Sequence, residues 1–65
     1  MTVSKEKVNV ILARKQLTAM AFCESAGMSR NRFYTILNSK SVAPRTAGRI
    51  AAALGVDVTE IIETD

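Results

Sequence analysis

The side chains best suited to chemical recognition lie close together in residues 29–35 of this 65-residue chain. They combine two guanidinium groups with an amide, a phenol and a hydroxyl: Arg30, Asn31, Arg32, Tyr34 and Thr35. A guanidinium donates paired hydrogen bonds to the major-groove edge of guanine, and an asparagine amide pairs with adenine in the same way. Tyr34 and Thr35 are suited to thymine methyl groups or phosphates. This segment therefore indicates recognition of the bases of duplex DNA.

A second set of side chains suits the phosphate backbone of DNA. It consists of hydroxyl, amide and basic groups around the first set: Thr18, Ser29, Asn38, Ser39, Lys40 and Arg45. Basic groups neutralise phosphates, and free N–H groups at a helix start such as Thr18 attract them. Contacts of this kind fix register along the duplex rather than select a sequence. For Arg49 we expect simple hydration.

The charge of the chain is unevenly distributed. All nine Lys and Arg residues lie between Lys5 and Arg49, and from Arg30 to Arg49 there is no acidic residue. The end of the chain is acidic, with Asp57, Glu60, Glu63 and Asp65. A surface of one sign attracts polyanions such as DNA. The alternative is that these Lys and Arg side chains only make an ordinary surface hydrophilic.

Enzymatic and metal-dependent functions are not expected. The chain has no histidine and one cysteine, Cys23, so it lacks the ligands of a typical metal site. It also lacks a nucleophile–base pair of the usual kind, and we predict no catalytic residues and no cofactor. Cys23 is expected to be a small core residue rather than a reactive thiol.

Length and composition predict one soluble domain over residues 1–65. Hydrophobic residues make up 48% of the chain, which is enough for a folded core. No apolar run reaches the roughly 20 residues that span a membrane. The first residues, MTVSKEKVNVILARK, do not resemble a signal peptide. A single cysteine cannot form an internal disulfide, so we expect a cytoplasmic protein without a membrane partner.

The elements that must position these side chains are helical, because no segment shows the sustained alternation of a β-strand. The expected helices run from a cap at Ser4 to about Lys15, over about 18–26, over about 29–38, and from Pro44 through Leu54. Gly27 and Gly55 are predicted to end helices in a left-handed conformation. Thr59 is expected to cap a last short helix containing Ile61 and Ile62.

The second and third helices, joined by a tight turn at Gly27, form a predicted helix-turn-helix. In such a unit the second helix enters the major groove. Phe33, Ile36 and Leu37 are expected to face the core, because their spacing places them on one side of the helix. The recognition side chains then point away from the core.

These residues resemble the Cro and phage-repressor type of helix-turn-helix regulators. The matching positions are Leu17-Thr18, Phe22, Ala26-Gly27, Met28, Ser29-Arg30, Phe33, Ile36, Ile50-Ala51, Ala53-Leu54-Gly55-Val56 and Ile61. The resemblance implies a compact, all-α, five-helix lambda-repressor-like domain whose recognition helix covers about 29–38. It also implies base-contacting roles for the exposed side chains near the start of that helix.

The chain departs from the family pattern at three places. Ala19 replaces a glutamine that often clamps a phosphate, so that contact should be absent. Cys23 replaces a small residue. Leu12 and Leu37 stand where many members have an Arg–Glu ion pair, and an apolar contact there is often neutral or stabilising.

Together these features predict sequence-specific binding of double-stranded DNA by a transcriptional regulator, a repressor by occlusion, of bacterial, phage or mobile-element origin. The expected target is a palindromic operator, bound by a homodimer whose contact involves the C-terminal segment around an exposed Ile62. Two alternatives remain open. One is the DNA-binding antitoxin of a toxin–antitoxin pair, and the other is a protein-interaction module that kept the fold without DNA binding.

Overall fold

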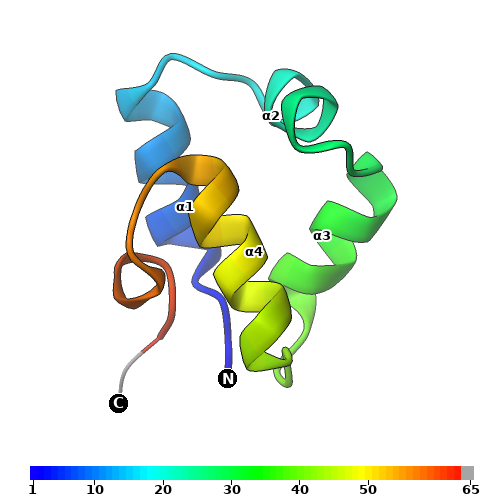
Figure 1. Cartoon of the computed structure of the whole chain (residues 1–65), viewed down its shortest axis with the longest axis vertical. Coiled ribbons are helices and arrows are strands. Elements are labelled where there is room, and N and C mark those ends of the chain that lie inside the picture. Colours follow the sequence, from blue (N-terminus) through cyan, green and yellow to red (C-terminus); the bar gives the residue numbers. More distant parts are fainter. Residues whose placement is uncertain (64–65) are drawn as a thin grey trace.

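The computed structural model describes residues 1–63, which form four helices joined by short loops around one apolar core (Figure 1). The helices are α1 (Lys5–Arg14), α2 (Ala19–Ala26), α3 (Arg30–Asn38) and α4 (Pro44–Leu54). Within residues 1–63 there is no β-strand, only an isolated antiparallel bridge between Val3 and Ile62. The predicted all-α class and the four main helices are confirmed.

The prediction of a fifth helix, capped by Thr59, is wrong. The chain forms instead a single 3-10 turn, η1 (Val58–Glu60), and its cap is Asp57 rather than Thr59. The Asp57 carboxylate accepts a hydrogen bond from the Thr59 N–H, and the Glu60 carboxylate accepts one from the Asp57 N–H, both at 3.3 Å. The chain then leaves the helical path because the Glu63 N–H donates to the carbonyl of Thr2. The acidic residue Asp65 lies outside the described residues.

The first three helices begin where hydroxyl side chains cap them. Ser4, Thr18 and Ser29 each accept a hydrogen bond of 3.0–3.2 Å from the N–H three residues ahead. Such caps satisfy N–H groups that have no partner inside the helix. α4 differs, because it begins with Pro44 and the preceding Ala43 provides no capping side chain.

Three helices end in the same way, with one residue in the left-handed conformation. These residues are Gln16 (φ 56°) after α1, Gly27 (φ 69°) after α2 and Gly55 (φ 75°) after α4. In each case the next N–H donates to the carbonyl five positions earlier, at 2.9–3.0 Å. This pattern satisfies the last carbonyls of a helix and favours glycine. The two predicted glycine ends are confirmed, and the one at Gln16 was not foreseen.

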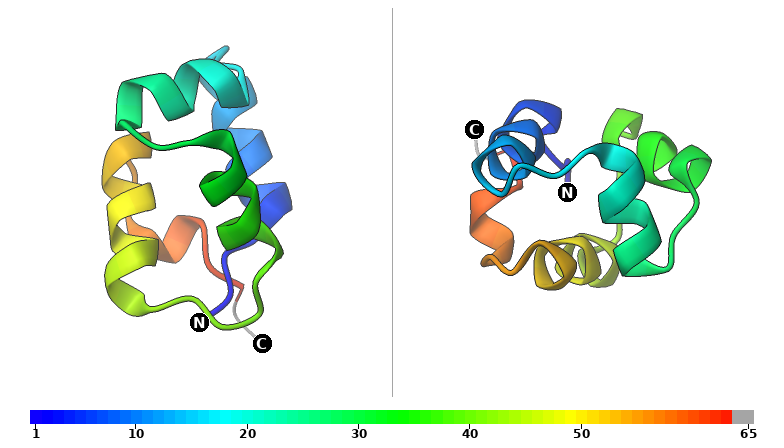
Figure 2. Two further views of the ribbon diagram at one scale, coloured as in Figure 1. Left: turned by 90° about the vertical axis from the view of Figure 1, so that its right-hand side faces the viewer. Right: turned by 90° about the horizontal axis from the view of Figure 1, so that it is seen from above.

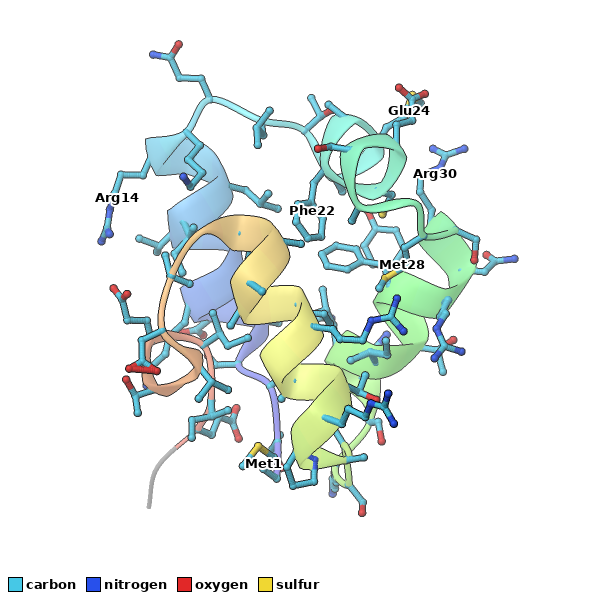
Figure 3. The ribbon with its side chains drawn as sticks, viewed as in Figure 1. Met1, Arg14, Phe22, Glu24, Met28 and Arg30 are labelled. Atoms are coloured by element: carbon cyan, nitrogen blue, oxygen red, sulfur yellow. The ribbon has the colours of Figure 1, made fainter. Side chains whose placement is uncertain are left out.

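The core holds α2 and α3 together through a pair of aromatic rings. Phe22 and Phe33 are 2% and 1% exposed, and their ring centroids lie 5.2 Å apart at a tilted angle. Phe22 projects into the middle of the molecule in Figure 3. Leu12 and Leu37 are buried in the same cluster, as an apolar replacement for an ion pair requires.

The two ends of the described chain lie near each other, at one end of the molecule (Figure 2). Ile62 was expected to be exposed, but it is partly buried against the core. Within residues 1–63 no helix has the length and hydropathy needed to cross a membrane.

Candidate nucleic-acid interface

α3 separates an apolar face from a polar one, as predicted. Phe33, Ile36 and Leu37 are buried, and each is at most 8% exposed. The five predicted base-contacting side chains are all exposed: Arg30, Asn31, Arg32, Tyr34 and Thr35. α3 lies on the side of the molecule away from α1 and the acidic C-terminal segment (Figures 1 and 2). Its polar face is therefore not buried, and the acidic segment up to Glu63 does not cover it.

Three polar side chains form a line along the outer face of α3. Asn31, Thr35 and Asn38 are spaced at i, i+4 and i+7, which places them on one side of a helix. The Thr35 hydroxyl donates a hydrogen bond of 2.7 Å to the carbonyl of Asn31. Its proton is therefore used within the helix, so Thr35 is better suited to an apolar contact through its methyl group than to donating to a phosphate.

Tyr34 is exposed but held by a buried neighbour. Its ring centroid lies 5.6 Å from that of Phe33, at an interplanar angle of 52°. The side chain is nevertheless 46% exposed. An aromatic group anchored in this way presents contact area at a small cost in conformational entropy.

Arg30 lies at the corner between α2 and α3. Its side chain extends outward and is exposed (Figure 3). Behind this corner, burial raises the pKa of the Cys23 thiol, and the positive charge of Arg30 lowers it by a smaller amount. Cys23 is 2% exposed, which confirms its prediction as a core residue.

A hollow of about 410 Å³ opens where α3 ends and α4 begins. It is lined by side chains from α3, the connecting loop and the first turn of α4: Arg32, Thr35, Ile36, Ser39, Ser41, Val42, Ala43 and Thr46. One guanidinium and several hydroxyls at a helix start without a capping side chain form a surface that suits a phosphate. Ser41 and Thr46 were not predicted, although the missing cap before Pro44 was visible in the sequence.

The remaining phosphate candidates lie at the starts of α2 and α3, and in the loop and the first turn of α4 that follow α3. Thr18 and Ser29 cap α2 and α3 and are exposed. At the other end Lys40 and Arg45 are exposed in the loop and in the first turn of α4. Ser39 is partly buried, and its hydroxyl donates to the Ser41 carbonyl at 3.2 Å. Ser29 and Ser39 therefore lie at the two ends of α3 and Lys40 lies next to its end, whereas Thr18 lies at the start of α2.

Comparison with known protein families gives one match. Residues 7–65 match the family described as the Cro/C1-type helix-turn-helix DNA-binding domain. No curated protein and no solved structure matches the chain. The matched range includes α2, α3, α4 and the whole candidate interface.

Proposed function

The chain belongs to the Cro/C1-type helix-turn-helix DNA-binding family, and from this premise we propose that it regulates transcription by placing α3 in the major groove of a specific DNA sequence. The observation that carries the proposal is the exposed polar face of α3 opposite a buried apolar face. The buried face fixes the helix on the domain, so the exposed face reaches the DNA as a rigid unit.

Base recognition belongs to the first two turns of α3. Arg30 and Asn31 stand at the start of this helix, where a recognition helix contacts base edges. Arg30 suits guanine and Asn31 suits adenine. Tyr34 and the methyl group of Thr35 add apolar contacts to thymine methyl groups.

Phosphate contacts flank the base contacts on both sides. Thr18 and Ser29 serve one strand through the helix starts that they cap. Arg32, Ser39 and Lys40 serve the other strand from the hollow and its loop. Arg45 and Asn38 extend this second cluster. Assigning Arg32 to a phosphate, rather than to a base, follows from its place in the wall of the hollow.

The regulator acts as a repressor in this proposal, because a domain bound at an operator excludes other proteins from the same DNA. Its setting is the cytoplasm of a bacterium, with a chromosomal, phage or mobile-element gene. Two copies bind a palindromic site with half-sites about 34–36 Å apart. Ile62 is partly buried, so a contact between copies through the C-terminal segment has less apolar surface than the sequence suggested.

Selection of bound sites from a random DNA pool tests this proposal, followed by titration of the selected site and of random DNA. We expect enrichment of one sequence with two-fold symmetry. Arg30→Ala should weaken binding to the selected site by about 1–3 kcal/mol, the contribution of one good contact between a side chain and a base. It should weaken binding to random DNA much less.

Arg14→Ala is the matched control, because it removes the same charge from the far side of the molecule (Figure 3). It should leave the preference for the selected site unchanged. Absence of any enriched sequence, together with flat titrations, would refute the proposal and favour a protein-interaction module. Equal losses on both DNAs for Arg30→Ala would make Arg30 a phosphate contact.

A further inference from the structure

Residues 1–3, here named the N-terminal strap, lie along the loop of residues 39–43 that follows α3. Met1 and Val42 exchange two main-chain hydrogen bonds, with the Val42 N–H donating at 2.7 Å and the Met1 nitrogen donating at 3.0 Å. The Thr2 hydroxyl donates to the carbonyl of Lys40 at 2.9 Å. The strap therefore holds the main chain of this loop at two alternate residues.

The other side of the strap is tied to the C-terminal segment. The Ser4 N–H donates to the carbonyl of Ile61 at 2.6 Å, and the Glu63 N–H donates to the carbonyl of Thr2 at 2.8 Å. Between these bonds Val3 is 1% exposed and belongs to the apolar core. The strap is thus anchored in the body of the domain and is not a free arm.

The loop that it holds carries phosphate candidates. Lys40 is exposed although its carbonyl is bonded to the strap, so the main chain is fixed while the ammonium group is free to reach outward. Ser39 and Ser41 hydrogen-bond to each other within the loop, and Val42 is 5% exposed. The side chains of Ser39, Ser41 and Val42 also line the hollow.

We infer that the N-terminal strap is a positioning element for DNA binding: it sets the loop of residues 39–43 in the conformation in which Lys40 and the hollow meet the phosphate backbone. A free loop loses conformational entropy when it binds, and a loop ordered in advance avoids that loss. The inference rests on the proposed function, and it gives Thr2 a role through Lys40 rather than through contact with DNA.

The test compares Thr2→Val with Ser4→Ala. Thr2→Val removes the hydroxyl that holds Lys40 and keeps the shape of the side chain. Ser4→Ala is the control, because its hydroxyl caps α1 and does not touch the loop, while its main-chain bond to Ile61 remains. Binding to the selected site and to random DNA is measured across a salt titration where both variants are folded, together with thermal unfolding and amide exchange at Val42.

We expect Thr2→Val to weaken binding to both DNAs by about threefold to tenfold, the effect of one hydrogen bond, and to reduce the salt dependence. Amide exchange at Val42 should accelerate. Ser4→Ala should lower the unfolding temperature and leave the affinity, the salt dependence and the exchange at Val42 unchanged.

Unchanged DNA affinity in Thr2→Val, or equal losses of affinity in both variants, would overturn the inference. Failure of the proposed function itself has a different signature, since the wild-type chain would then bind no DNA. In that case the positioning role for DNA falls with it, while exchange at Val42 still shows whether the strap orders the loop.

Discussion

Arg30 and Arg32 are residues of the same type on the same helix, but their side chains have different surroundings. Arg30 extends outward from the start of α3 (Figure 3), whereas Arg32 lines the hollow together with hydroxyl groups. The first arrangement leaves the guanidinium free to pair with a base edge. The second places it among groups that suit a phosphate. Replacement of the two arginines is therefore expected to have different effects on DNA binding.

The prediction at this scale concerns Arg32→Ala and Lys40→Ala. Each removes one cation from the proposed phosphate contacts, so each should lower the magnitude of the salt slope of DNA binding by about one unit. Affinity for the selected site and for random DNA should fall by similar factors. Salt titrations of both complexes measure this, with Arg14→Ala as the control. A loss of affinity confined to the selected site would show that Arg32 contacts a base. An unchanged salt slope for Lys40→Ala would show that Lys40 does not contact DNA.

At the scale of the elements, the helix ends explain how short helices stay in place. α1, α2 and α4 all end with a left-handed residue followed by a hydrogen bond to the carbonyl five positions earlier. Glycine occupies this position after α2 and α4, but α1 uses Gln16. A residue with a Cβ atom is strained there, because Cβ approaches the following carbonyl oxygen. Gln16 is therefore expected to destabilise the end of α1 relative to a glycine at the same position.

We predict that Gln16→Gly stabilises the domain by about 0.5–1 kcal/mol, because relief of roughly 1–2 kcal/mol of strain exceeds the added entropy of glycine in the unfolded chain. The reverse change, Gly27→Ala, should destabilise by about 1 kcal/mol. A Cβ atom at Gly27 would have no neighbour within 4 Å, so its cost comes from the backbone alone. Denaturant unfolding of both variants measures these effects. A loss of stability in Gln16→Gly would show that its side chain contributes more than its backbone costs.

At the scale of the whole molecule, one small core joins every element, so unfolding is expected to be cooperative. Cys23 is part of that core, and burial raises the pKa of its thiol while Arg30 opposes the shift to a smaller extent. The folded state therefore holds the thiol proton more tightly than the unfolded state does. This linkage stabilises the fold below the pKa of the unfolded thiol, and the contribution is lost as pH rises through the raised pKa of the folded state.

The resulting prediction is that the free energy of unfolding falls more steeply toward alkaline pH in the wild-type chain than in Cys23→Ala. Denaturant unfolding over a pH series measures both slopes, and the difference between the two chains isolates the contribution of the thiol. The variant should be less stable at neutral pH, because it leaves a small cavity. Parallel pH profiles would show that the thiol titrates equally in the folded and unfolded states.

The sequence alone determined most of the helices and the polar face of α3. Ser4, Thr18 and Ser29 act on N–H groups three residues away, and Gly27 and Gly55 act on carbonyls within five residues. Interactions between residues so close in the chain can be predicted from the local sequence. The same holds for the spacing of Phe33, Ile36 and Leu37, which defines the buried side of α3 and hence its exposed side.

Only the tertiary structure decided what lies around that face. The strap joins Met1 to Val42 and Thr2 to Glu63, the hollow forms between α3 and α4, and the last predicted helix is replaced by one 3-10 turn. The strap and the departure of the chain from the helical path after η1 depend on hydrogen bonds between segments far apart in the chain. The hollow depends on how α3 and α4 pack against each other. Such partners are chosen when the core assembles and brings the segments together, and no local pattern of residues specifies them in advance.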